Sequence, residues 1–195
     1  MNTDWPALQN GSDIRGVALE GIPDEKVNLT PDVVGRIGTA FCRWLSEELG
    51  KPVAGLRVAV GMDSRLSGPA LKKAFSVAVS ELGVDVGDAG LASTPAMFMS
   101  TILEGLEFDG GVMLTASHLP FNRNGMKFFT SEGGLNKNNI TSVLEFAAEA
   151  PSQGDVEPGS ISPIPLMEKY TADIVDLVRR SVNNGDRPLE GLNIL

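Results

Sequence analysis

A serine followed by the only histidine of the chain is the feature best suited to chemistry. Ser117 and His118 follow a short apolar segment at residues 111–114, with Thr115 and Ala116 between. In open α/β sheets ligands bind outside the carboxyl ends of the strands, so a strand at 111–114 would place this serine where sites form. The polar segment that follows carries two cations and consists of Asn122, Arg123, Asn124, Gly125 and Lys127.

The Ser-His pair is unspecific by itself. Adjacent residues on an extended chain point to opposite faces, so His118 need not touch the Ser117 hydroxyl. A serine hydrolase would also need a third group to orient the histidine, and no GxSxG elbow surrounds any serine. GxxxxGK[ST] is absent as well, and no GxGxxG follows a strand. A hydrolase remains an alternative that labelling by a fluorophosphonate probe would reveal.

Hydrophobic periodicity and capping residues predict the elements that position this segment. They predict helices at 31–49, 69–82, 96–103, 136–150 and 166–181, and strands at 56–60, 84–86, 111–114 and 126–129. A strand, a helix and a strand in tight succession form a βαβ unit with a parallel sheet. The expected fold class is therefore α/β.

Composition divides the chain into three parts. Pro, Gly and Ser dominate residues 151–165, as in linkers. We expect a domain at 1–150, a linker at 151–165 and the incomplete start of a second domain at 166–195. In that last part a single helix precedes an apolar segment, 189–195, that is typical of the entry into a buried strand. A lone helix and half a strand cannot bury enough surface to form a domain.

Charge and rare residues exclude several function classes. The 195 residues include 16 Lys and Arg against 25 Asp and Glu, a net charge of −9. This balance argues against binding to nucleic acid or to anionic membranes, which need a basic surface. A single cysteine excludes an intrachain disulfide, and a single histidine excludes zinc sites that need two. With no spanning segment and no secretory signal, we expect a cytoplasmic protein, an organelle being left open.

Five segments resemble a known family. T-A-S-H-L-P at 115–120 and N-G-M-K at 124–127 resemble the active-site serine loop of the α-D-phosphohexomutases, a superfamily that includes phosphoglucomutase, phosphomannomutase and phosphoglucosamine mutase. The usual family pattern is T-A-S-H-N-P and then N-G-x-K, with the lysine ten residues after the serine, as from Ser117 to Lys127. The other segments agree in order: G-S-D-I-R-G at 11–16, G-M-D-S-R-L-S-G at 61–68 and S-T-P at 93–95.

The resemblance implies a fold and a reaction. The fold would be domain I of the family, a three-layer α/β/α domain with a mixed, largely parallel sheet. Ser117 would be carried as phosphoserine and would move a phosphoryl group between C1 and C6 of a hexose phosphate through a sugar bisphosphate. Arg15 and Lys127 would bind and neutralise phosphate oxygens. His118 would act as general base or acid at the sugar hydroxyl.

The resemblance also implies partners outside these residues. Mg²⁺ would bind Ser117 through its phosphate, and the remaining metal ligands would lie in domains II–IV, beyond this chain. A bisphosphate of the glucose 1,6-bisphosphate type would be the activator. The segment N-G-D-R at 184–187 lacks the aspartates of the family metal loop and is not expected to bind metal.

Several residues differ from the family pattern or have a structural interpretation. Leu119 stands where the family has Asn, and Phe121 stands where a second proline is common. Asp63 and Arg65 are interpreted as a salt-bridged turn that opens the second helix. Arg123 has no family counterpart and is expected to be exposed.

Two hypotheses of different classes therefore remain. The first is the N-terminal part of a phosphohexomutase, inactive when isolated. The alternative is a truncated non-catalytic relative that binds sugar phosphates or proteins, which sequencing the gene beyond Leu195 would distinguish. The sequence leaves open which hexose phosphate is used, whether the chain is a natural product or a fragment, and its oligomeric state.

Overall fold

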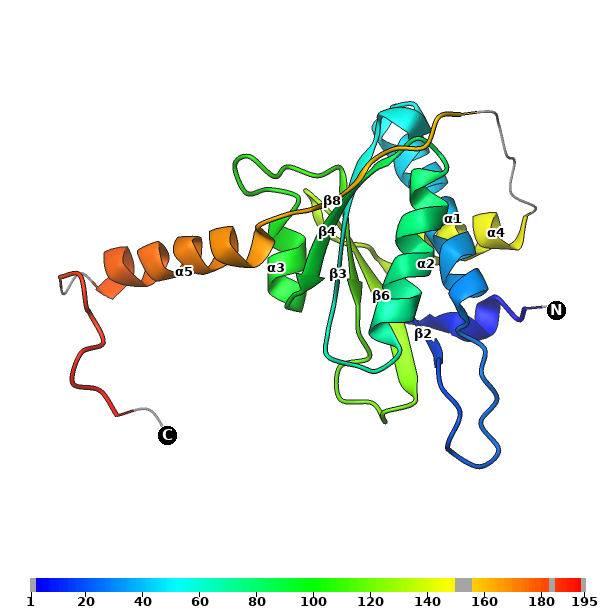
Figure 1. The fold of residues 1–195 in the computed structure, drawn as a ribbon, viewed down its shortest axis with the longest axis horizontal. Coiled ribbons are helices and arrows are strands. Elements are labelled where there is room, and N and C mark those ends of the chain that lie inside the picture. The colour runs from blue at the N-terminus through cyan, green and yellow to red at the C-terminus, as the bar shows by residue number, and fades with distance from the viewer. Residues whose placement is uncertain (1–2, 150–155, 183–184, 194–195) are drawn as a thin grey trace.

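A mixed β-sheet forms the middle layer of the molecule (Figure 1). The computed structural model describes residues 3–149, 156–182 and 185–193. The strand order is β1-β2-β6-β5-β3-β4-β8, and β7 pairs with β6. The strands are β1 (Gln9–Asn10), β2 (Asp13–Val17), β3 (Arg57–Met62), β4 (Asp85–Leu91), β5 (Gly110–Leu114), β6 (Arg123–Thr130), β7 (Gly133–Gly134) and β8 (Ile161–Pro163).

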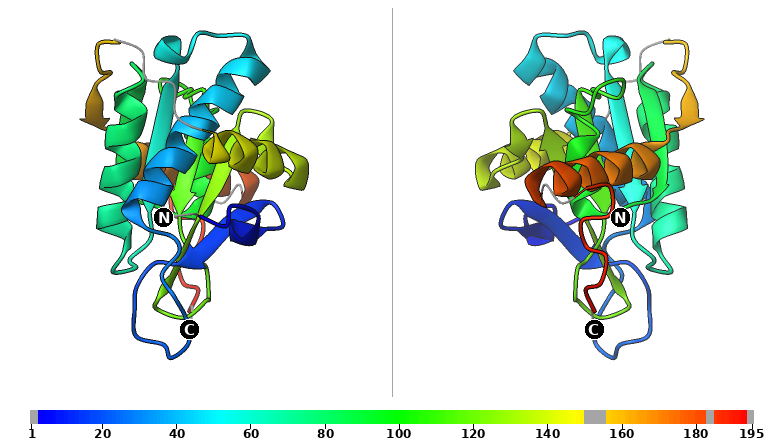
Figure 2. Two further views of the ribbon diagram at one scale, coloured as in Figure 1. Left: turned by 90° about the vertical axis from the view of Figure 1, so that its right-hand side faces the viewer. Right: turned by 90° about the vertical axis from the view of Figure 1, so that its left-hand side faces the viewer.

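Helices cover both faces of this sheet, which confirms the expected α/β/α class (Figure 2). On one face lie α1 (Pro31–Leu49), α2 (Gly68–Ser80) and α4 (Lys137–Ala148), and on the other lies α3 (Thr94–Met99). Helix α5 (Leu166–Val182) begins beside α3, where Leu166 is buried, and extends away from the sheet (Figure 1). Short 3₁₀ helices occur at Pro6–Leu8 and Val53–Gly55. Each face has its own cluster of buried apolar side chains. No helix of the described residues is both long and apolar enough to cross a bilayer.

Helix α1 shows why the sequence predicts some elements accurately. The Thr30 side chain accepts a hydrogen bond from the Val33 N–H, and Pro31 occupies the first helical position. At the other end Gly50 ends the helix in the left-handed conformation, with φ of 62°. The helix spans residues 31–49 as predicted, and its buried face packs on the sheet.

The sheet brings two loops together at one edge. Strands β3 and β5 are parallel neighbours, with Met62 paired to Leu114, so the segments that follow them leave the sheet side by side. The Asp63 N–H donates to the Leu114 carbonyl at 3.0 Å and continues this pairing. Strand β6 then returns antiparallel to β5 and pairs with β2, where Arg15 faces Gly125. Four elements thus meet at the loop that carries Ser117.

Several segments differ from the prediction. The sequence patterns do not predict β1, β2 or β7, although β2 carries Arg15. Residues 161–163 of the predicted linker form β8, a parallel edge strand beside β4, because Asp85 accepts hydrogen bonds from the Ser160 N–H and hydroxyl. Residues 189–193 form turns and coil instead of a strand. Helix α3 ends at Met99 and is followed by turns. Residues 151–155 of the predicted linker and residues 194–195 of the predicted strand entry lie outside the described residues.

Candidate functional site

Ser117 and His118 lie exposed in a turn just beyond the carboxyl end of β5. Ser117 has φ of 55°, in the left-handed region that non-glycine residues rarely adopt and that costs about 1–3 kcal/mol. This turn, unlike an extended chain, directs both side chains the same way, and Ser117 Oγ lies 3.4 Å from His118 Nδ1. The two groups are within reach of one another, at a distance longer than an ordinary hydroxyl hydrogen bond.

A chain of hydrogen bonds holds the amide side of Ser117. The Ser117 N–H donates to Thr115 Oγ1 at 3.0 Å, and the Thr115 hydroxyl donates to Asp63 Oδ2 at 2.7 Å. Thr115 is buried, whereas Asp63 lies in the turn after β3. The left-handed conformation of Ser117 is therefore tied to the neighbouring strand as well as to its own loop.

Asp63 and Arg65 form the predicted salt bridge, with Arg65 Nε 3.3 Å from Asp63 Oδ2. The prediction was incomplete, because Arg65 also crosses to the serine loop. Its terminal nitrogens donate to backbone carbonyls between residues 117 and 123 at 2.8 to 3.0 Å. The turn that opens α2 is thus bonded to the loop after β5.

The two predicted phosphate-binding cations meet at one carboxylate. Arg15 Nη2 lies 3.0 Å from Asp13 Oδ2, and Lys127 Nζ lies 2.5 Å from the same oxygen. Arg15 Nη1 also donates to the Thr115 carbonyl at 3.2 Å. The structure thus brings Arg15 and Lys127 together beside the start of the serine loop, and the three side chains carry a formal charge of +1. Neither cation forms a hydrogen bond to Ser117 among the described contacts.

Asn124 and Gly125, which precede Lys127, hold β6 close to its neighbours. A Cβ on Gly125 would lie 2.3 Å from the Ile14 carbonyl oxygen and 2.7 Å from Arg15 Cδ, so only glycine fits under Arg15. Asn124 is fully buried, and its Nδ2 donates to Ser67 Oγ at 2.8 Å. The N-G pair therefore packs β6 against β2 and against the start of α2.

Arg123 is not simply exposed as expected. Its guanidinium pairs with Glu25 Oε1 at 2.6 Å, and the Asn122 side chain donates to Glu25 Oε2 at 2.7 Å. These two hydrogen bonds hold the pKa of Glu25 below its usual value. Glu25 thereby fastens the loop after β2 to the end of the serine loop.

Sequence reasoning missed Asp13, Thr115 and Glu25 as partners of the site residues. Asp13 stands two residues before Arg15 on a strand, so both side chains lie on one face, and this spacing is a signal that could have been used. Glu25 gives no such signal, because it lies 98 positions from Arg123.

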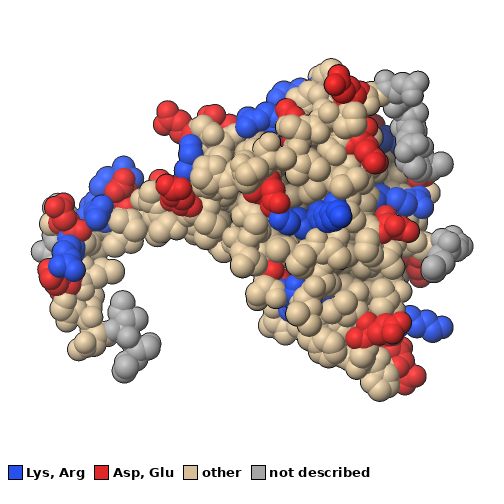
Figure 3. All heavy atoms as spheres, viewed as in Figure 1, with Lys and Arg blue, Asp and Glu red and all other residues tan. Residues whose placement is uncertain are grey.

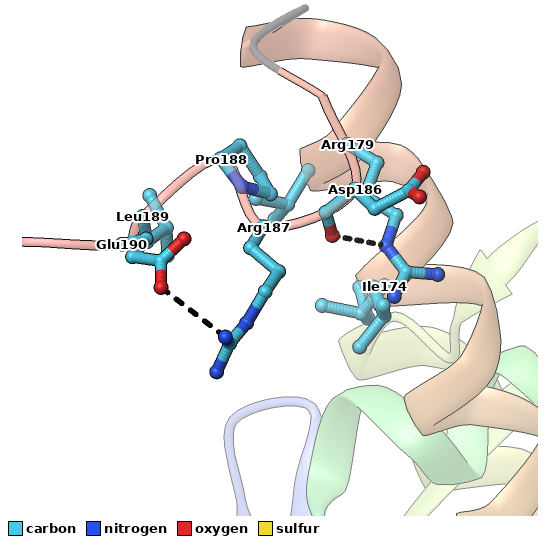
Figure 4. Close-up of a pocket in the computed structure, with 9 residues that line it drawn as sticks. Ile174, Arg179, Asp186, Arg187, Pro188, Leu189 and Glu190 are labelled. Atoms are coloured by element: carbon cyan, nitrogen blue, oxygen red, sulfur yellow. Dashed lines mark hydrogen bonds and ion pairs between the residues drawn. The ribbon is translucent and has the colours of Figure 1, made fainter.

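The described residues do not complete a metal site. In the ranges 3–149, 156–182 and 185–193, no group of three or more His, Cys, Asp or Glu side chains could hold a metal ion. In the segment 184–187, Asp186 and Arg187 form hydrogen bonds with neighbouring residues. The Asp186 carbonyl accepts from Arg179 Nε at 3.0 Å, and Arg187 pairs with Glu190 at 3.2 Å (Figure 4).

Those residues line a pocket of about 420 Å³ against α5. Its wall is largely apolar and includes Ile174, Val175, Val178 and Leu189. It contains none of the predicted site residues. Elsewhere, basic and acidic side chains are interspersed over the face seen in Figure 3. The serine loop therefore remains the candidate site.

The chain matches the family model for phosphoglucomutase/phosphomannomutase, alpha/beta/alpha domain I, over residues 7–154. It is 32% identical to a phosphoglucosamine mutase of Symbiobacterium thermophilum over 196 aligned residues, which cover 97% of this chain and 40% of that protein. A phosphoglucosamine mutase of Natranaerobius thermophilus is 31% identical over 92% of this chain and 38% of its own length.

A solved structure gives the same result. A phosphoglucomutase/phosphomannomutase family protein of Burkholderia thailandensis superposes with a TM-score of 0.68 at 28% identity, over 85% of this chain and 34% of that protein. The chain thus spans about 40% or less of the length of these relatives. The fold, the family model and the relatives agree: this chain belongs to the phosphoglucomutase/phosphomannomutase family and contains its α/β/α domain I.

Proposed function

We propose that the chain is the catalytic-serine domain of a hexose phosphate mutase, and that Ser117 carries the phosphoryl group. One observation supports this most directly: Ser117 is exposed at the carboxyl end of β5 in a left-handed turn that Thr115 and Asp63 hold in place. A hydroxyl fixed and exposed in this way, next to an imidazole, suits transfer to and from a bound substrate.

The reaction would exchange one phosphate ester for another. A hydroxyl oxygen of the sugar monophosphate would attack the phosphorus, the new P–O bond would form, and the bond from phosphorus to Ser117 Oγ would break. His118 would take the proton of the sugar hydroxyl and give a proton to Ser117 Oγ as that oxygen leaves, and the reverse step would use the same transfers in the opposite order. The sugar bisphosphate would then reorient in the site. Its other phosphate would be transferred to Ser117, so that the phosphoserine is regenerated.

Arg15 and Lys127 would supply positive charge for phosphate oxygens. Phosphoryl transfer depends mostly on positioning and on charge stabilisation, so cations beside the serine loop are the groups that the reaction needs. Asp13 holds both cations in the described structure. A phosphate dianion would therefore compete with the Asp13 carboxylate, which keeps the two side chains oriented while the site is empty.

Magnesium and the activator belong to this proposal and not to the described geometry. When bound, Mg²⁺ would neutralise oxygens of the phosphate on Ser117, and its other ligands would come from outside the described residues. A bisphosphorylated hexose would supply the first phosphoryl group. Because the chain spans only about 40% of the first relative, the full activity is proposed for the complete gene product.

The substrate class is a hexose monophosphate. Two of the relatives are named phosphoglucosamine mutases, and this favours glucosamine phosphate as the first substrate to assay, followed by glucose and mannose phosphates. The 195-residue chain by itself is expected to turn over none of them above background. A normal rate from the isolated chain would contradict this expectation.

The test is a substitution in the complete gene product. Ser117→Ala should abolish mutase turnover with Mg²⁺ and a hexose bisphosphate present, because the phosphoryl carrier is lost. Ser64→Ala, which removes an exposed serine from the neighbouring turn after β3, is the matched control and should leave turnover unchanged. Turnover retained in Ser117→Ala would overturn the proposal, and an inactive wild type would favour a non-catalytic binding module.

A further inference from the structure

Arg65 spans from the turn before α2 to the loop that carries Ser117. Its Nη1 donates to the carbonyls of Pro120 at 2.8 Å and Arg123 at 3.0 Å. Its Nη2 donates to the carbonyls of Ser117 at 2.9 Å and Leu119 at 2.8 Å. The four hydrogens of the two terminal nitrogens are therefore all used on one loop.

The segment 117–121 depends on these bonds. Its other hydrogen bonds are local: the Ser117 N–H donates to Thr115 Oγ1, and the Leu119 N–H donates to the Ala116 carbonyl. Among the described hydrogen bonds, one other joins this segment to an element outside its loop: the N–H of Arg123, the first residue of β6, donates to the Pro120 carbonyl at 3.0 Å. Arg65 is thus the link from this segment to the turn after β3.

Asp63 and Arg65 act on opposite sides of the same residue. Asp63 holds Thr115, which accepts the Ser117 N–H, and Arg65 binds the Ser117 carbonyl. Both peptide groups that flank the Ser117 Cα are therefore fixed by the turn after β3. This explains how Ser117 keeps its unusual φ of 55° in an exposed loop.

Only arginine has the geometry for this arrangement. The guanidinium is a rigid planar fork whose terminal nitrogens reach two pairs of carbonyls, whereas the donors of a lysine ammonium share a single nitrogen. The Arg65 side chain is only 12% exposed, and its Nε lies 3.3 Å from Asp63 Oδ2 as an ion pair, so burial and charge both keep the guanidinium beside the loop.

We propose that Arg65 is a positioning residue for phosphoryl transfer at Ser117. It fixes the backbone that carries Oγ, and its guanidinium bonds to carbonyls of the loop and pairs with Asp63. This inference rests on the proposed function of Ser117, since the direction of Oγ matters only if that oxygen reacts. Loss of the guanidinium should slow transfer and leave sugar phosphate binding intact, so kcat falls while KM stays the same.

The first test uses the chain as it is and needs no activity. Amide hydrogen exchange is measured for wild type, Arg65→Met, Arg65→Lys and the control Lys72→Met, which removes a cation of α2 that pairs with Asp88. In Arg65→Met the amides of Ser117, Leu119 and Arg123, which donate hydrogen bonds within or beside the loop, should exchange about tenfold faster or more, relative to those of β5, because the loop loses its bonds from a charged donor. Arg65→Lys should give a smaller increase, and Lys72→Met should give none in this loop.

The second test uses the complete gene product. Arg65→Met should lower kcat about tenfold or more at a KM within about twofold of wild type, and Arg65→Lys should restore only part of the rate. Unchanged exchange of the loop in Arg65→Met, a loss of protection that extends equally through β5, or an unchanged kcat would each overturn the proposal. If wild type transfers no phosphoryl group, the proposed function fails instead, and the exchange result still decides whether Arg65 holds the loop.

Discussion

Replacing Gly125 by alanine tests the packing of β6 under Arg15. The added Cβ would lie 2.3 Å from the Ile14 carbonyl oxygen, 2.7 Å from Arg15 Cδ and 3.0 Å from the Thr115 carbonyl oxygen. Two of these three atoms are backbone oxygens on either side of β6, so the clash cannot be relieved by a side-chain rotation. Strand β6 would have to move away from β2 at the position where Gly125 pairs with Arg15.

The size of the effect follows from this geometry. Overpacking a well-packed site costs about 1–3 kcal/mol, and rigid backbone on both sides places Gly125→Ala at the upper end, about 3 kcal/mol. For a chain of this size, that corresponds to a decrease in Tm of about 6–12 °C.

Gly134→Ala is the matched control for this measurement. Gly134 also lies in a strand paired with β6, but the nearest atom to its added Cβ is 3.8 Å away. Because glycine weakens a strand, this change should be neutral or should stabilise by up to about 1 kcal/mol. Urea unfolding followed by the fluorescence of the buried Trp5 and Trp44 measures both variants. Equal unfolding free energies for the two variants would refute the packing argument.

Three further predictions concern charge and burial. Hydrogen bonds from Arg123 and Asn122 lower the pKa of Glu25 in the folded chain, so the ionised Glu25 stabilises the fold. This contribution to the unfolding free energy is complete above the unfolded pKa of about 4.3 and is lost as pH falls through the lower folded pKa. The difference in unfolding free energy between wild type and Glu25→Gln should therefore be constant above about pH 5 and shrink below about pH 4, and a difference independent of pH would contradict this. Burial raises the pKa of the Cys42 thiol, so a thiol reagent at neutral pH should label the native chain no faster than the chain unfolds, and rapid labelling of all molecules would be the contrary result. Asp13→Asn removes the carboxylate shared by Arg15 and Lys127, so inorganic phosphate should bind about tenfold more tightly by NMR titration, and an unchanged affinity would count against a phosphate site there.

Local signals in the sequence predict the elements that have them. Helix α1 has an N-cap at Thr30, a proline at its first position and a glycine at its end, so its bounds follow from its own residues. Strand β8 has no such signal. Its three residues lie in a stretch of Pro, Gly and Ser, and it joins the sheet because Asp85, 75 positions earlier, accepts hydrogen bonds from Ser160.

In the candidate site too, some residues can be identified from local sequence patterns, whereas the contacts that hold them depend on distant parts of the chain. Ser117, His118, Arg15 and Lys127 come from a recognisable pattern, and the fold brings Arg15 and Lys127 to one carboxylate. The contacts that hold the loop are tertiary. Arg65 lies 52 to 58 positions from the carbonyls that it binds, so its second role depends on the parallel pairing of β3 and β5, which no local pattern specifies.

Locating the transferred phosphate tests the central claim most directly. The complete gene product is incubated with glucose 1,6-bisphosphate labelled in its phosphates, digested, and its peptides are sequenced by tandem mass spectrometry. We expect one labelled phosphoryl group on Ser117, and none in Ser117→Ala. Label on another residue, or label that persists in Ser117→Ala, would contradict the assignment of Ser117 as the phosphoryl carrier.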